Sequence, residues 1–455
     1  MADVVPVADD QLLRTVRTRL SAELPPTITN PFSTVPGRDD VIREAIRGAL
    51  DGEGHDAAAS TRWVDELFDE LVGLGPLQPL MADPRTTDIL VNRWDEIFIE
   101  RGGRLERTGA HFRDQAHLEQ VIGKIVALVG REISVDKPLV DARMVDGSRA
   151  NAVFAPVGGP TLCIRKFNRL RLALLPPFRS ARRRLAVDDD GNATTDELAG
   201  AAPTAGDWVR AAGMSTAMAS FLEAMALARA TVLIAGATGS GKSTLLRSIV
   251  DAFPAHERVI TIEDTAELEL DNPHWVKLEC VHQHELAGQD TSARRLDVAD
   301  LVQNALRMRP DRLIIGEIRN SREAFHTLEA LNTGHDGSAT TIHAGSAADA
   351  LARLELLIGR SFTQLSPVEI RGYIARVFDV IVFIARLRSG LRCVLEVCEV
   401  AGVRRDGDYD LRPVFVTDID GDGDSRRPHF RAIGDYRPGP RLARKLELEG
   451  LRWIS

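Results

Sequence analysis

The spacing of hydrophobic and polar residues changes along the chain and first indicates helices. Apolar residues three or four apart, set between charged ones, predict helices over Asp9 to Ala22, Arg38 to Asp51 and Ser60 to Leu74. A Gly-Pro pair follows the last of them and is typical of a helix end. We therefore expect residues 1–75 to form a small helical appendage.

The next stretch alternates apolar and polar residues in short runs, with one amphipathic helix among them. The predicted elements are strands at Thr87 to Val91, Glu96 to Glu100, Leu139 to Met144, Arg149 to Phe154 and Thr161 to Lys166, and a helix at His117 to Leu128. An Asp-Gly pair at 146–147 predicts a tight hairpin between two of these strands. We expect an α+β domain over residues 76–168.

The composition breaks at residues 169–206. Six arginines around a Pro-Pro pair are followed by three aspartates and then by a stretch rich in Gly, Ala and Thr. A nucleic-acid or lipid patch is the weaker interpretation, because basic runs are commonly just solvated and the acidic run would blunt any affinity for anions. We interpret the stretch as a surface linker or insertion.

From residue 207 to 455, helices and buried strands alternate. Four buried strands are predicted at Thr231 to Ala235, Arg258 to Ile262, Arg312 to Ile315 and Ser338 to Ile342. Strands that alternate with helices in this way are typical of a parallel α/β sheet. Three more are expected to extend the sheet in antiparallel fashion, at Phe378 to Ile384, Arg392 to Ala401 and Pro413 to Thr417.

Composition and charge narrow the class of protein. A chain of 455 residues predicts two or three domains at about 150 residues each, and 44% hydrophobic with 27% charged residues is ordinary for a globular protein. The net charge of −9 speaks against a dedicated nucleic-acid coat. Four cysteines without a C-x-x-C pair favour a reducing cytoplasm. The sequence shows neither a leader peptide nor a transmembrane segment, so we expect any membrane role to go through a partner.

The strongest motif is GATGSGKS at residues 236–243, between the apolar strand TVLIA and an amphipathic helix. It fits the pattern G-x-x-x-x-G-K-[ST] in the strand, loop and helix context of a P-loop. Its glycines let backbone N–H groups point at phosphate oxygens, Lys242 reaches the terminal phosphates, and Ser243 offers a hydroxyl to Mg²⁺. The candidate nucleotide-binding residues are Gly236, Ala237, Thr238, Gly239, Ser240, Gly241, Lys242, Ser243 and Thr244.

Hydrolysis also needs a carboxylate at the end of another core strand. Glu317 follows the apolar run LIIG and is expected at the carboxyl end of its strand, where ligands of open α/β sheets bind. Its expected task is to orient or deprotonate the attacking water. Because Gly316 precedes Glu317 and no Asp stands there, we expect Mg²⁺ to be held by Ser243, the phosphates and water.

Two more clusters follow neighbouring strands. After RVITI, Glu263 could share a helical face with Glu267 toward the metal, while Asp264 caps the same helix; the two interpretations are compatible. His343 follows a predicted strand, where it could sense the γ-phosphate, and His335 precedes that strand. A lone His is more often structural, but a position one strand after Glu317 favours a catalytic role for both.

Taken together, GATGSGKS, TIEDTAEL, LIIGEIR and TGHDGSATTIHA closely resemble the Walker A, Asp box, atypical Walker B and His box of the type II/type IV secretion ATPase superfamily. The upstream segments GLGPLQPLMADPRTTDILVN, LVDARMVDGSRANAV and TLCIRKF resemble its CpaF/TadA branch, which powers Flp (tight adherence) pilus assembly. The resemblance runs from about residue 74 to 417. The stretch after Phe167 is longer than is usual in the family, and the tetracysteine loop of the type II branch is missing.

This resemblance implies a RecA-like ATPase domain behind an α+β, PAS-like N-terminal domain, with ATP and Mg²⁺ as ligands. It implies a homohexameric ring in the cytoplasm, peripheral to the inner face of the cell membrane, that moves an inner-membrane platform protein. It also implies that Arg143, Arg149 and Arg165 reach the phosphates, a role that suits guanidinium groups. A two-residue turn at 146–147 would put Arg143 and Arg149 on opposite faces, and a three-residue loop would align them. We expect at least one of the pair to act.

Three alternatives remain beside a pilus or secretion motor: a conjugation-type secretion ATPase, a RecA-type nucleic-acid-dependent translocase, and a non-hydrolysing nucleotide switch or scaffold. A translocase needs a basic face interleaved with aromatic residues, whereas aromatics make up only 5% of this acidic chain. Glu317 together with His343 speaks against a switch. We therefore expect an ATP-hydrolysing motor that does not bind nucleic acid directly.

Overall fold

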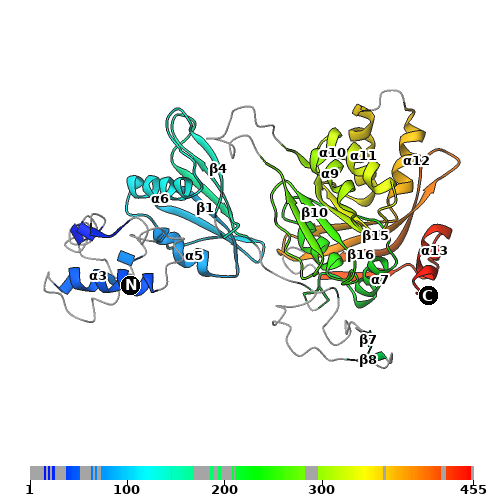
Figure 1. Cartoon of the computed structure of the whole chain (residues 1–455), viewed down its shortest axis with the longest axis horizontal. Coiled ribbons are helices and arrows are strands. Elements are labelled where there is room, and N and C mark those ends of the chain that lie inside the picture. Colours follow the sequence, from blue (N-terminus) through cyan, green and yellow to red (C-terminus); the bar gives the residue numbers. More distant parts are fainter. Residues whose placement is uncertain are drawn as a thin grey trace. The chain divides into compact units, whose positions relative to one another are not determined.

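In the computed structural model the chain divides into two units, residues 1–168 and 169–455 (Figure 1). The residues that the structure describes are 15–16, 19–20, 23–25, 37–51, 63–64, 67–68, 73–144, 146–167, 172, 174, 185–187, 193–195, 208–209, 211–281, 296–361, 365–421 and 427–451. Both units mix helices with sheets, and the fold is α/β.

The helix predicted at residues 38–51 is confirmed as α3, Arg38–Asp51. Its residues Ile42 and Ile46 are fully buried, four positions apart on one face. The other two predicted helices, at 9–22 and 60–74, lie largely outside the described residues. Their described apolar positions join the same small core, which includes Val16, Leu20, Val64 and Leu67.

The first unit also contains an antiparallel six-stranded sheet in the order β3-β2-β1-β6-β5-β4. Its strands are β1 Thr86–Arg93, β2 Glu96–Arg101, β3 Arg104–Arg107, β4 Leu139–Arg143, β5 Arg149–Val153 and β6 Thr161–Arg165. Its helical segments are η1 Gly75–Leu77, α5 Gln78–Ala82 and α6 Gln115–Leu128. Alternate residues of β4, β5 and β6 are buried in one core with α6, and the opposite face of these strands carries mostly polar side chains together with the exposed Leu139.

The second unit is built on a nine-stranded sheet in the order β11-β10-β12-β13-β9-β14-β15-β16-β17. Its strands are β9 Val232–Ala235, β10 Val259–Glu263, β11 Trp275–Glu279, β12 Arg312–Ile318, β13 Ala339–Ile342, β14 Val380–Arg386, β15 Arg392–Val403, β16 Tyr409–Asp420 and β17 Arg427–Ala432. The predicted strands are confirmed, but one expected direction is wrong: β14 runs parallel to β9, and only the strands after β14 are antiparallel. Two helices return the chain across the sheet before β14, so this strand enters in the same direction as β9.

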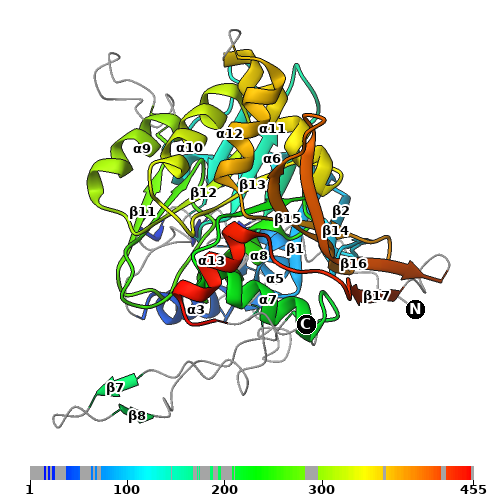
Figure 2. The ribbon, with the colours of Figure 1, turned by 90° about the vertical axis from the view of Figure 1, so that its right-hand side faces the viewer.

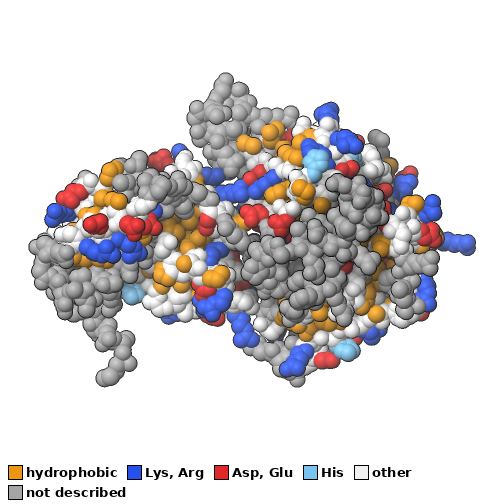
Figure 3. All heavy atoms as spheres, turned by 60° about the horizontal axis from the view of Figure 1, so that its bottom comes forward, with side chains coloured by type: hydrophobic (Ala, Val, Ile, Leu, Met, Phe, Trp, Pro, Cys, Tyr) orange, Lys and Arg blue, Asp and Glu red, His pale blue; other side chains and the backbone are white. Residues whose placement is uncertain are grey.

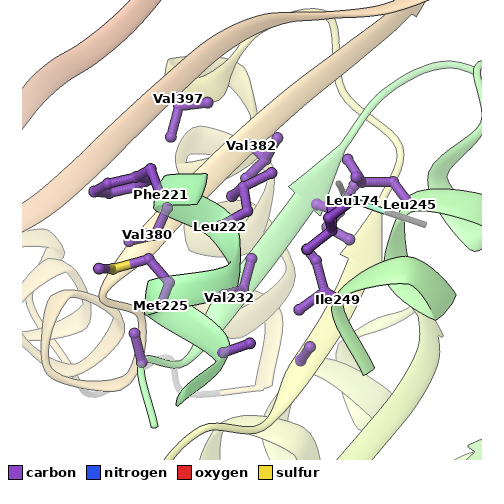
Figure 4. Close-up of a cluster of buried hydrophobic side chains, with 14 of the residues drawn as sticks. Leu174, Phe221, Leu222, Met225, Val232, Leu245, Ile249, Val380, Val382 and Val397 are labelled. Atoms are coloured by element: carbon purple, nitrogen blue, oxygen red, sulfur yellow. The ribbon is translucent and has the colours of Figure 1, made fainter. Parts of the chain in front are cut away.

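Helices cover both faces of this sheet (Figure 2). The helices are α7 Thr216–Leu227, α8 Lys242–Val250 and α13 Pro440–Leu448 on one face, and α9 Val298–Ala305, α10 Ser321–Asn332, α11 Ala347–Ser361 and α12 Pro367–Val377, with the turn η3 Leu306–Met308, on the other. The strands supply alternate residues to the two cores. Figure 4 shows Phe221, Leu222 and Met225 of α7 beside the valines of β9 and β14.

Near the start of the second unit in sequence, β7 Leu185–Val187 and β8 Ala193–Thr195 pair as a small antiparallel ribbon. The rest of the predicted linker at 169–206, with its six arginines, lies largely outside the described residues. Within the described part of the chain, no helix is both long and apolar enough to span a bilayer.

Candidate nucleotide-binding site

One edge of the nine-stranded sheet gathers the predicted motifs. The strands β9, β10, β12 and β13 are mutually parallel, so their carboxyl ends share an edge. At that edge Gly236 follows β9 and Glu263 ends β10. Glu317 is the second-to-last residue of β12, and His343 follows β13. Glu263, Glu317 and His343 therefore converge on the loop that begins at Gly236, although the farthest of them lies about a hundred residues away in sequence.

The loop after β9 has the backbone of a phosphate cradle. Gly239 and Gly241 have φ of +70° and +103°, conformations that side chains rarely adopt. A Cβ on Gly236 would lie 2.4 Å from the carbonyl oxygen of Ile384, so this position has no room for a side chain. Helix α8 begins at Lys242 and presents its first N–H groups toward the loop. Ser240 is buried, and its Oγ has no hydrogen-bond partner among the described residues, so a phosphate oxygen would satisfy it.

Lys242 connects this loop to His343 and Glu317. Its Nζ donates to the carbonyl oxygens of Gly236 and Ala237, each at 3.0 Å, and lies 3.3 Å from Nδ1 of His343. The other ring nitrogen of His343, Nε2, lies 2.7 Å from Oε1 of Glu317. Burial and the neighbouring Lys242 lower the pKa of His343 below its ordinary value. The neutral ring then accepts from Lys242 at Nδ1 and carries its hydrogen at Nε2. Oε1 of Glu317 accepts no hydrogen bond from the described residues, so His343 and Glu317 are in close contact without a hydrogen bond between them.

Arg319 holds the second oxygen of the same carboxylate. Its Nε donates to Oε2 of Glu317 at 3.0 Å, and its Nη1 donates to Oδ2 of Asp264 at 2.5 Å. The sequence interpretation missed this arginine. One signal was present, because Arg319 comes two residues after Glu317, and residues at that spacing along an extended strand lie on one face.

Glu263 accepts hydrogen bonds from the backbone of the segment that follows β10. It is 5% exposed and accepts the backbone N–H groups of Glu267 at 3.0 Å and Leu268 at 3.2 Å. The expected helix after Glu263 is wrong: residues 264–270 are not helical, so Glu263 and Glu267 share no helical face and Asp264 caps nothing. Buried apolar residues at 266, 268 and 270 hold this segment extended instead. Burial raises the pKa of Glu263 to about 7, against the opposing effect of the two N–H groups.

The site fits a magnesium ion at Ser243. Ser243 Oγ donates to Oε2 of Glu267 at 3.3 Å, so a hydroxyl and a carboxylate oxygen face each other at the start of α8. Hard oxygen donors of this kind suit Mg²⁺, which keeps several waters and binds through one or two protein groups plus phosphates. Neither here nor in the rest of the described chain is a group of three His, Cys, Asp or Glu side chains placed to hold a metal.

His335 does not join these residues within this chain. It precedes β13 by a turn and therefore lies at the amino edge of the sheet, opposite His343. Its Nδ1 lies 3.0 Å from the carbonyl oxygen of Ala330, at the end of α10. Strand polarity thus separates the two histidines that the sequence motif placed together, and the geometry gives His335 a turn-forming role.

The three predicted arginines lie in one row in the first unit. The register pairs Arg143 of β4 with Arg149 of β5, and Arg149 with Arg165 of β6. A bond from Met144 N to Ser148 O at 2.8 Å closes a three-residue loop, so the strands take the alternative that aligns Arg143 with Arg149. All three positions fall on the face of the sheet opposite its core.

Comparison with known proteins adds an independent finding. Residues 70–389 match the family described as Type II/IV secretion system protein. The chain is 32% identical over 332 residues to a putative conjugal transfer protein of Mycobacterium tuberculosis. The match covers 73% of this chain and 85% of that protein. It is 31% identical over 319 residues to the type IV secretion system protein VirB11 of Brucella suis, covering 68% and 84% of the two chains.

Among solved structures, the chain is similar to the VirB11 ATPase of the Brucella suis type IV secretion system in complex with sulphate. The identity is 29%, the match covers 71% of this chain and 95% of that chain, and the TM-score is 0.35.

Proposed function

Since the chain belongs to the type II/IV secretion system protein family and is an ATPase homologous to type IV secretion ATPases, we propose that it is a homohexameric motor that drives secretion or pilus assembly. In this proposal it works in the cytoplasm at the inner face of the cell membrane and moves a platform protein there. The observation that carries the proposal is the contact of Lys242, His343 and Glu317 at the loop that begins with Gly236.

The chemistry follows from what these side chains offer. The N–H groups of the loop and Lys242 bind the phosphate oxygens of ATP, and their positive charge stabilises the charge that develops during phosphoryl transfer. Glu317 accepts a proton from the attacking water. His343 Nε2 lies 2.7 Å from Oε1 of Glu317, so the ring limits how far that carboxylate can turn away from the site. Mg²⁺, when bound, would be held by Ser243 with Glu267 close by, and would neutralise phosphate charge.

Arginines of the first unit complete the proposed site. Arg143, Arg149 and Arg165 form a cationic row on the sheet face opposite the core, which suits a triphosphate. We propose that one or more of them reaches the phosphates of bound ATP.

We assign the chain to the CpaF/TadA branch on its upstream motifs; a conjugation-type secretion ATPase is the nearest alternative. A nucleic-acid translocase is less favoured. On the face drawn in Figure 3, the coloured basic side chains are interspersed with acidic ones, whereas a track for nucleic acid requires a continuous basic groove. Neighbouring genes for two polytopic membrane proteins and a small pilin would support the pilus branch.

The experiment that tests the proposal measures ATP turnover of the full chain, with Lys242→Ala as the variant. We expect the wild-type chain to hydrolyse ATP as a hexamer in sedimentation, and to capture a polytopic membrane protein from its own host. Lys242→Ala should fold, judged by circular dichroism, and lose turnover. Turnover that survives this substitution would contradict the site, and turnover that depends on added nucleic acid would favour the translocase.

A further inference from the structure

Arg319 lies where two elements of the site meet. It follows β12, and its side chain joins the carboxylate of Glu317 at 3.0 Å to that of Asp264 at 2.5 Å. Asp264 belongs to the segment after β10, which Glu263 holds in place. The backbone N–H of Arg319 donates to Glu323 at 2.7 Å, so the main chain at this arginine is fixed as well.

The shape of the guanidinium group makes this contact directional. Its N–H donors lie in one plane at fixed angles, so two carboxylates bound by Nε and Nη1 are held at a set separation. His343 Nε2 lies 2.7 Å from Oε1 of Glu317, and Arg319 occupies Oε2. Oε1 accepts no hydrogen bond from the described residues, so the bond from Arg319 to Oε2 sets the direction of the carboxylate, while the nearby imidazole limits its rotation sterically.

We propose that Arg319 is a positioning residue for hydrolysis: by spanning from Asp264 to Glu317, it fixes the direction in which the Glu317 carboxylate faces the attacking water. This inference rests on the proposed function, in which Glu317 is the base. Arg319 acts through Glu317 and need not touch the nucleotide.

The expected effect is moderate because the contact is partly solvated. The Arg319 side chain is 46% exposed and that of Glu317 is 16% exposed, so water screens much of the attraction between the charges. Loss of Arg319 leaves His343 as a partner of the carboxylate, so orientation is loosened rather than lost. We expect kcat to fall about tenfold, well short of the effect of removing a base.

The chain offers a matched control at Arg322. Its side chain is also 46% exposed and also binds two carboxylates, those of Asp297 and Asp300 at the start of α9. It lies three residues further along the chain and contacts none of the residues in the proposed site. Arg322→Ala therefore removes the same charge and the same kind of clamp without touching Glu317.

The experiment compares ATP turnover by the full-length Arg319→Ala, Arg319→Lys and Arg322→Ala chains. Arg319→Ala should lower kcat about tenfold while KM for ATP stays within about twofold, since the contacts that bind ATP are unchanged. Arg319→Lys should recover part of kcat, and Arg322→Ala should stay within about twofold of wild type.

Two results would overturn the inference. Equal kcat for Arg319→Ala and Arg322→Ala would show that the clamp does not serve hydrolysis. A rise in KM at constant kcat would make Arg319 a nucleotide contact. If the alanine variant unfolds early, the lysine variant replaces it in the same comparison with Arg322→Ala. Turnover that survives in Glu317→Gln would instead refute the proposed function, so the two failures are distinguishable.

Discussion

Glu263 allows a test of the site that needs no nucleotide. Its carboxyl is 5% exposed, and the Cγ of its side chain would lie 3.1 Å from a Cβ placed on Gly316 of β12. Glu263→Gln keeps an oxygen that can accept the N–H groups of Glu267 and Leu268, and it removes the titration. The substitution therefore isolates the free energy of ionising one buried carboxyl.

The sign and size follow from the pKa. Burial raises the pKa of Glu263 from 4.5 to about 7, so the folded chain favours the protonated form. The stabilisation of the folded chain that comes from protonated Glu263 is complete below pH 4.5 and is lost as the pH rises through about 7. The difference between the pKa of Glu263 in the unfolded and in the folded chain corresponds to about 3 kcal/mol in the free energy of unfolding. About 2 kcal/mol of this stabilisation should be lost between pH 5 and pH 8.

The assay is urea denaturation of the wild-type and Glu263→Gln chains at several pH values. Comparing the two proteins at each pH cancels the other titrating groups, which they share. We expect the variant to gain about 2 kcal/mol relative to wild type between pH 5 and pH 8. A constant difference across this range would refute the reasoning, since it would mean that Glu263 is solvated or already ionised in the folded state.

Three further predictions concern the loop, the histidine and the last helix. Gly236→Ala should abolish ADP binding in calorimetry, because its Cβ would lie 2.4 Å from the carbonyl oxygen of Ile384; affinity within threefold of wild type would contradict this. The pKa of His343 is lowered, so turnover should hold down to pH values below the ordinary 6.5 and then fall as the ring takes up a proton beside a lysine, with His343→Gln lacking this step. Arg441→Ala should cost about 2 kcal/mol of unfolding free energy, read from the urea midpoint, because buried Asp379 loses an ion-pair partner and several carbonyl groups lose a donor; an unchanged midpoint would count against it.

Most strands and the P-loop were predictable because their signals are local. Alternating apolar residues mark β4, β5 and β6 within a residue or two, and the continuous apolar runs of β9 and β12 mark buried parallel strands. Parallel strands bring their carboxyl ends to one edge, so the convergence of Glu317, His343 and the loop at Gly236 followed from strand order.

The features that the sequence did not reveal depend on tertiary packing. The direction of β14 is set by the helices before it, and a strand pattern carries no direction. The segment after Glu263 has acids at helical spacing, yet burial of its apolar residues outweighs that weak preference. Arg319 ends the quoted motif LIIGEIR, but its role was not evident from the sequence because its partner Asp264 lies 55 residues away in the chain.

The central claim is that Glu317 at the end of β12 drives hydrolysis at the loop held by Lys242. The most direct test is single-turnover hydrolysis of ATP by the full Glu317→Gln chain, with nucleotide binding measured in the same preparation. Our account predicts that ATP binds within about threefold of wild type while hydrolysis falls at least about a hundredfold, since the base is lost and the phosphate cradle remains. Hydrolysis at the wild-type rate would contradict it.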